Sequence, residues 1–138
     1  MKNSIQTSHQ PLPDLIARFK VKRGLFRTEK VEAKVYALDQ HTCIFKTDKL
    51  FNPGDTLLLD LVMTMPFENV DASALSALIT ERKKHCSNFF YLVDFIDFGS
   101  RSANATQNRL ERICRILTKK QSLRSRRNRA TAGLKQSA

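Results

Sequence analysis

Apolar and polar residues alternate along most of the first hundred positions, with the period of two that half-buried strands produce. In the segment 15–22, Ala17 and Phe19 fall on one face and Arg18 and Lys20 on the other. Gly24 and the run Asn52-Pro53-Gly54-Asp55 are suited to turns, while residues 64–73 show no regular period. The pattern predicts six strands, at residues 15–22, 25–38, 42–47, 55–63, 74–84 and 89–98.

The second strand should place Val31, Ala33, Val35 and Ala37 together on its buried face. The last strand, FFYLVDFIDF, is apolar on both faces, which is typical of a central strand with a second layer packed on it. We expect that layer to be a C-terminal helix.

Asn104 and Gln107 have the spacing of a helix-capping pair. The apolar residues that follow recur at helical spacing and define one stripe: Leu110, Ile113, Cys114 and Leu117. The predicted fold is therefore mainly β, a small antiparallel six-stranded β-barrel with a C-terminal α-helix.

At 138 residues the chain suits one core with extensions. We divide it into a flexible N-terminal segment (1–13), a barrel-plus-helix unit (14–118) and a basic C-terminal extension (119–138). The first residues lack the apolar centre of a signal peptide, and no apolar run has the length of a membrane span. With three scattered cysteines and no metal-ligand spacing, we predict a cytoplasmic protein without a metal site.

The net charge of +11 is uneven along the chain. Residues 119–138 hold seven basic residues and no acid, which leaves 17 basic and 13 acidic residues, a net of +4, in residues 1–118. Such a tail attracts polyanions or acidic partners, although it also fits a solvated helix end. The candidate contact residues are Lys119, Lys120, Arg124, Arg126, Arg127 and Arg129.

The sequence offers no catalytic constellation. His9, His41 and His85 fall in separate segments, and no glycine-rich phosphate loop is present. We therefore predict a non-enzymatic protein without a cofactor. The cationic run at residues 81–84 precedes Phe89, Phe90 and Tyr91, which could form a stacking surface for bases only if these rings are not core.

The order of these elements resembles the PilZ domain, a small bacterial barrel that senses the second messenger cyclic di-GMP. The resemblance covers about residues 14–128 and is carried by FNPGDTLLLDL, the strand YLVDFID and the helix RLERICRIL. It implies a signalling domain that docks to a protein partner in motility, adhesion or pilus control. Cyclic di-GMP is then a regulatory ligand.

The family binds its ligand through two motifs, RxxxR before the first strand and [D/N]xSxxG in a turn. Forked guanidinium groups clamp phosphates and guanine edges, and the glycine allows close backbone approach. Here the turn falls on ALDQHT, residues 37–42, where Ala37 replaces the acid, Asp39 the serine and Thr42 the glycine. A register shifted by two places Asp39 on the acid and His41 on the serine, and neither register restores the motif.

Residues 1–14 contain no arginine, and the literal RxxxR is Arg23 to Arg27, inside the first predicted hairpin. The candidate ligand residues are accordingly Arg23, Arg27, Asp39 and His41. Two interpretations remain open. In the favoured one, cyclic di-GMP binding is weak or lost and the domain is a constitutive adaptor; in the other, the ligand binds through the arginines and the basic tail. The alternative function is a nucleic-acid module that binds RNA through this tail.

Overall fold

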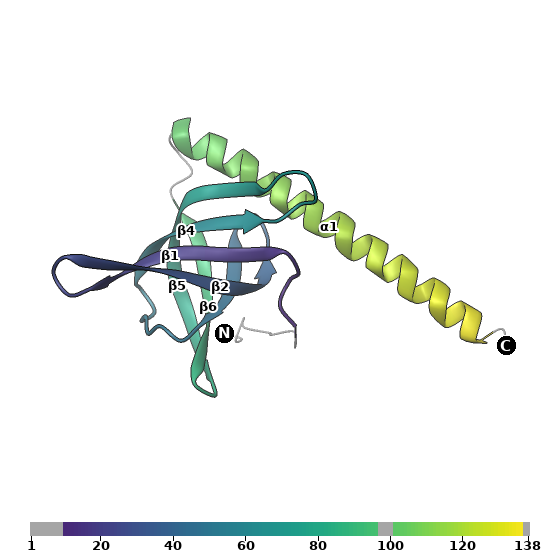
Figure 1. The fold of residues 1–138 in the computed structure, drawn as a ribbon, viewed down its shortest axis with the longest axis horizontal. Coiled ribbons are helices and arrows are strands. Elements are labelled where there is room, and N and C mark those ends of the chain that lie inside the picture. The colour runs from purple at the N-terminus through teal and green to yellow at the C-terminus, as the bar shows by residue number, and fades with distance from the viewer. Residues whose placement is uncertain (1–9, 97–100, 137–138) are drawn as a thin grey trace.

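The computed structural model describes residues 10–96 and 101–136. They form a closed antiparallel β-barrel followed by one long helix (Figure 1), which confirms the predicted fold class. The elements are β1 (Leu15–Arg23), β2 (Arg27–Leu38), β3 (Thr42–Thr47), β4 (Thr56–Met63), β5 (Val70–His85), β6 (Asn88–Ile96) and α1 (Arg101–Gln136).

The strand order around the barrel is β1-β2-β3-β6-β5-β4. The barrel closes where Leu15–Arg18 of β1 pair with Asp60–Met63 of β4. All neighbouring strands are antiparallel. Because successive side chains of a strand point to opposite faces of the sheet, each strand directs alternate side chains to the barrel interior. The interior side chains include Phe45, Leu59 and Tyr91, all with 0% exposure.

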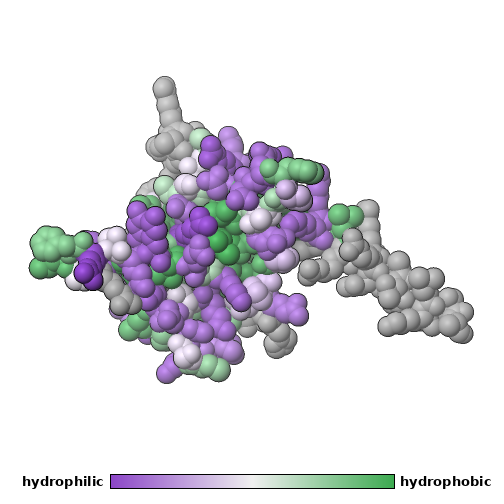
Figure 2. Space-filling view, viewed as in Figure 1, coloured by the Kyte–Doolittle hydropathy of each residue, from purple (hydrophilic) through white to green (hydrophobic). Residues whose placement is uncertain are grey.

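The outer part of the β1–β2 hairpin, residues 20–30, continues beyond the barrel as an arm. β1 pairs with β4 only through residue 18, and β2 pairs with β3 only from residue 34. The strand residues between these limits therefore form backbone pairs only between β1 and β2. The arm ends in a turn at Gly24-Leu25-Phe26, where Gly24 has a φ of +72°. Figure 1 shows the arm projecting from the barrel, and Figure 2 shows hydrophobic residues at its end.

The predicted turn at Asn52-Pro53-Gly54-Asp55 is confirmed. The Asp55 N–H donates to the Asn52 carbonyl at 3.0 Å, and the Asp55 carboxylate accepts from the Asn52 N–H at 2.7 Å. The turn is fixed to the core by Tyr91, whose hydroxyl accepts from the Phe51 N–H at 2.8 Å and donates to the Lys49 carbonyl at 2.7 Å.

Three details of the strand prediction are wrong. β2 begins at Arg27 rather than at residue 25, because Leu25 and Phe26 belong to the turn. β5 begins at Val70 rather than at residue 74, because small polar residues conceal its alternation and a bulge interrupts it. At this bulge Ala74 has a φ of 58°, and its N–H donates to the Asp60 carboxylate at 2.8 Å. A second bulge at Tyr36 moves Ala37 off the inner face that Val31, Ala33 and Val35 share.

The expected role of the helix is also wrong in part. The stripe of α1 is buried as predicted, with Leu110 and Ile113 at 0% exposure, but it joins the interior cluster and packs against β5. The outer face of β6 forms a separate cluster, in which Phe90 and Leu92 pack with Ile44 of β3 and Tyr36 of β2. Neighbouring strands, rather than the helix, therefore supply those contacts.

The helix begins at Arg101, before the predicted cap at Asn104, and runs without interruption past residue 118. Its basic residues lie off the apolar stripe: Arg109, Arg112, Arg115 and Lys119 are exposed. Within the described ranges, no helix combines the length and the apolar character needed to cross a membrane.

Candidate ligand site

The turn between β2 and β3 is held together by one carboxylate. Asp39 accepts hydrogen bonds from the N–H groups of His41 and Thr42, both at 2.7 Å, and its own N–H donates to the Thr42 carbonyl at 3.0 Å. The His41 carbonyl accepts from the Phe95 N–H of β6 at 2.8 Å. The turn is therefore a compact Asx-type turn anchored to the neighbouring strand.

The charge of Asp39 is stabilised by this arrangement. Partial burial acts to raise the pKa of the Asp39 carboxyl. The hydrogen bonds from His41 and Thr42 and the nearby His41 imidazole oppose that effect, and the resulting pKa lies below its ordinary value. The carboxylate is consequently ionised at neutral pH.

The turn needs no glycine. Among the described non-glycine residues, a left-handed φ occurs at Asp14, Ala74 and Cys86, and none of these lies in residues 37–42. Thr42 begins β3 with ordinary strand backbone. The residue in place of the family's glycine is therefore accommodated without strain, although its side chain occupies space that a glycine would leave open.

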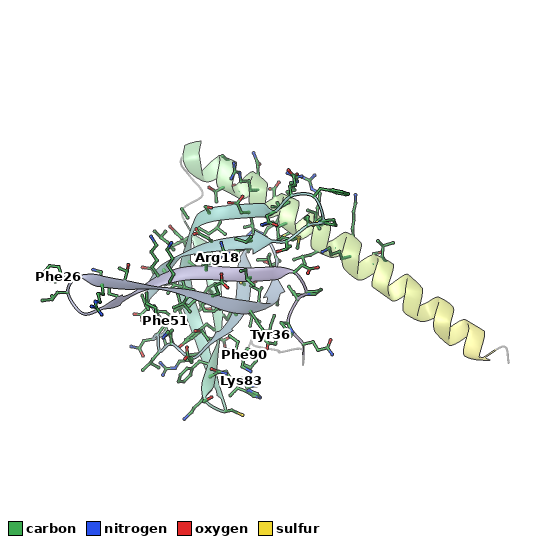
Figure 3. The ribbon with its side chains drawn as sticks, viewed as in Figure 1. Arg18, Phe26, Tyr36, Phe51, Lys83 and Phe90 are labelled. Atoms are coloured by element: carbon green, nitrogen blue, oxygen red, sulfur yellow. The ribbon has the colours of Figure 1, made fainter. Side chains whose placement is uncertain are left out.

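A cavity of about 520 Å³ lies beside this turn, between the end of β2 and one face of α1. This volume falls in the range of small-molecule sites. Figure 3 labels one wall residue, Tyr36. The lining residues are Leu12, Tyr36, Ala37, Leu38, Asp39, Gln40, His41, Cys114, Leu117 and Thr118.

The walls of the cavity are amphipathic rather than cationic. Asp39 and His41 are the ionisable groups on the turn side, and the lining that the structure describes includes no arginine or lysine. On the helix side, burial and then the nearby Asp39 and Glu111 charges raise the pKa of the Cys114 thiol to about 11. A protonated thiol is a poor nucleophile, so this cysteine contributes mainly to packing.

Sequence reasoning placed the candidate site on the turn at residues 37–42, with Asp39 and His41 as ligand residues, but did not locate Leu12, Tyr36 or the helix residues there. Leu117 and Cys114 were recognised as members of the apolar stripe, but no pattern in the chain indicates that the edge of the stripe faces the β2–β3 turn. Leu12 reaches the site because its N–H donates to the Val35 carbonyl at 2.7 Å, beside the β2 bulge.

The structure does not bring the two candidate arginines to this turn. Arg23 and Arg27 pair across the end of the β1–β2 arm. From Arg27, β2 runs eleven residues to Leu38, about 36 Å of extended chain. In Figure 3, Phe26 and Tyr36 accordingly lie toward opposite ends of this hairpin.

The basic residues of the C-terminal extension all fall on α1. Lys119 is exposed, and Lys120 Nζ lies 3.2 Å from the Asp14 carboxylate. The backbone of α1 carries Arg124, Arg126, Arg127 and Arg129 onward, while their side chains lie outside the described part of the structure.

The stacking surface considered near residues 81–84 is not present in that form. Phe90 and Tyr91 are core residues, at 4% and 0% exposure, and their rings pack against other aromatic rings. Phe89 is half-buried, with the Arg82 guanidinium 5.9 Å from its ring centre. Phe89, Phe90 and Tyr91 therefore do not form an exposed row of rings on which nucleic-acid bases could stack.

No protein-family model matches the sequence, and no curated protein matches it. Among solved structures, the fold is similar to the inhibitor of motility of Bacillus subtilis, MotI/DgrA, with a TM-score of 0.42 and 13% identity. The match covers 78% of this chain and 51% of that protein, so the chain spans about half its length.

Proposed function

We propose that this protein is a non-enzymatic regulatory domain of the PilZ type, which acts by docking to a protein partner in motility, adhesion or pilus control. The support is the six-stranded barrel with its C-terminal helix, in the element order on which the sequence resemblance rests. In this proposal cyclic di-GMP binds weakly or not at all, and the domain is a constitutive adaptor.

One observation carries the proposal of weak ligand binding, namely the separation between the arginine pair and the turn. A phosphate clamp needs guanidinium groups within hydrogen-bond distance of the ligand. Arg27 lies at the far end of β2 from Asp39. The turn itself presents an ionised carboxylate whose Oδ1 already accepts two backbone hydrogen bonds. A doubly anionic dinucleotide gains little from such a surface.

Titration calorimetry with cyclic di-GMP tests this proposal. The wild-type chain should give no saturable heat at low micromolar ligand, and Asp39→Ala and Arg27→Ala should behave identically to it. A micromolar isotherm that Arg23→Ala or Arg27→Ala abolishes would contradict the proposal and favour a rearranged clamp. An isotherm that only His41→Ala or Asp39→Ala weakens would instead place a ligand in the cavity beside the turn.

The second candidate function is RNA binding through the basic extension. It is favoured by the continuation of α1 to Gln136, which carries the basic residues beyond the barrel on a helical backbone (Figure 1). Binding should weaken linearly in a plot of log affinity against log salt concentration. Replacing the six candidate residues from Lys119 to Arg129 with glutamine should abolish it, while binding that survives this change, or no binding at low salt, would exclude this function.

A further inference from the structure

The end of the β1–β2 arm combines two features that the fold itself does not require, namely exposed apolar side chains and a concentration of like charge. The first is apolar exposure, since Leu25 and Phe26 are 93% and 97% exposed. The turn geometry requires only Gly24, at a φ of +72°, and makes no demand for apolar residues at the next two positions. Exposed loop ends are normally polar, so adjacent apolar side chains at such an end indicate a contact surface.

The second feature is the concentration of like charge behind these two side chains. The segment 20–30 contains five basic residues and one acid. Lys20 pairs directly with Lys30 across the two strands, and like charges in that position destabilise a hairpin. The one acid, Glu29, pairs with Lys49 at 3.0 Å. Among the described residues, no acidic side chain forms an ion pair with Lys20, Lys22, Arg27 or Lys30.

The two features are ordered along the arm. Leu25 and Phe26 form its end, and at about 3.3 Å per residue Lys22 lies roughly 10 Å behind them and Lys20 and Lys30 roughly 13 to 17 Å behind them. Figure 3 shows Phe26 at the end of the arm, clear of the barrel. An apolar point followed by cations matches a lipid bilayer, in which the acyl boundary lies several ångströms beneath a layer of phosphates.

We propose that the end of the β1–β2 arm docks on an anionic membrane surface. Leu25 and Phe26 insert to the level of the acyl boundary, and Lys20, Lys22, Arg27 and Lys30 contact lipid phosphates. We choose a membrane as the partner because of charge complementarity, since the arm is net positive and convex and an anionic bilayer is net negative and deformable. Docking would cover the exposed apolar side chains and would reduce the repulsion between Lys20 and Lys30. The proposal is independent of cyclic di-GMP and of the cavity beside Asp39.

Binding of the full chain to vesicles tests the proposal. Vesicles of equal parts phosphatidylcholine and phosphatidylglycerol should bind it at least about tenfold more tightly than phosphatidylcholine alone. The double variant Leu25→Ser/Phe26→Ser should weaken binding to the anionic vesicles by at least about tenfold. Phe67→Ser is the matched control, because Phe67 is 100% exposed on a different loop, and it should bind like the wild type.

The chain contains no tryptophan, so a single reporter can be introduced at the arm. Phe26→Trp should show a blue shift of its emission on anionic vesicles and quenching by brominated acyl chains, whereas Phe67→Trp should show neither. Because both sites are exposed, the urea midpoint of every variant should equal that of the wild type.

Three results would overturn the proposal. Full binding by the Leu25→Ser/Phe26→Ser variant would assign the attraction to the basic extension on α1. An equal shift at positions 26 and 67 would indicate adsorption without a defined orientation. Absence of binding to the anionic vesicles at low salt would leave the arm as a contact for a protein rather than for lipid.

Discussion

Asp39 uses one carboxylate oxygen to accept from two backbone N–H groups, those of His41 and Thr42. Replacing it with alanine should lower the free energy of unfolding by about 1 kcal/mol at neutral pH, because both donors then depend on solvent. Asp39→Asn retains an acceptor oxygen and should recover part of this loss. Urea denaturation of the three proteins provides the measurement, and equal midpoints would contradict the assigned role.

The same residue predicts a pH dependence. Because the pKa of Asp39 is lowered in the folded protein, the charged form stabilises the fold above the ordinary carboxyl pKa. That stabilisation is lost as the pH falls through the lowered value. The difference in unfolding free energy between wild type and Asp39→Asn should therefore be present near neutral pH and disappear in acid. A difference that stays constant over this range would rule out ionisation as its origin.

Tyr91 is the second residue whose side-chain hydrogen bonds should stabilise the fold. Its buried hydroxyl bonds to the Phe51 N–H and the Lys49 carbonyl, so Tyr91→Phe should cost about 1–3 kcal/mol of unfolding free energy. Tyr36→Phe is the control, since no hydrogen bond of the Tyr36 hydroxyl occurs among the described residues, and its cost should stay below about 0.5 kcal/mol. Thermal and urea unfolding compare the two, and equal losses would contradict the assignment.

At the residue scale, the sequence alone identified the polar members of the turn but not their local structural role. The interpretation of Asp39 as a remnant of a ligand motif stays a prediction, and the structure adds that its carboxylate is bonded to backbone N–H groups of its own turn. Such a local hydrogen bond depends on backbone direction over three residues, and residue type alone does not specify that direction.

At the scale of elements, the predictions are correct where apolar residues recur with a regular strand or helix period. β3 matches its predicted bounds, Thr42–Thr47, and the helical stripe from Leu110 to Leu117 is buried as expected. The errors at Tyr36 and near Ala74 coincide with bulges, because one extra residue shifts the alternation on which the strand prediction rests.

The attachment of α1 yields a prediction at this scale. Ile113 is fully buried between the helix and the barrel core, so Ile113→Ala should cost about 2–5 kcal/mol of unfolding free energy. Arg115→Ala, on the exposed face of the same turn of helix, should change it by less than about 0.5 kcal/mol. Urea denaturation followed by far-ultraviolet circular dichroism measures both, and a small loss for Ile113→Ala would mean that the helix packs only loosely.

For the whole molecule, the sequence predicted the architecture and the turn at residues 37–42, but not the cavity beside that turn. Short connections between successive strands, followed by one amphipathic helix, restrict the arrangement strongly, although β3 and β4 follow one another in the chain without being neighbours in the barrel. The cavity instead forms where Leu12, the β2–β3 turn and the helix segment near Leu117 come together. No local sequence pattern predicts that these three distant segments lie side by side. Likewise the RxxxR pair and the turn are close in sequence and far apart in space, because one extended strand separates them.

The length of α1 has a hydrodynamic consequence. Its 36 residues measure about 54 Å, and the 16 residues after Lys120 continue for about 24 Å past its ion pair with Asp14. A rod attached to a small barrel (Figure 1) increases friction and makes rotational diffusion anisotropic. A monomer of 15.8 kDa should therefore elute from a sizing column ahead of compact proteins of equal mass. Its mass by light scattering should remain that of one chain.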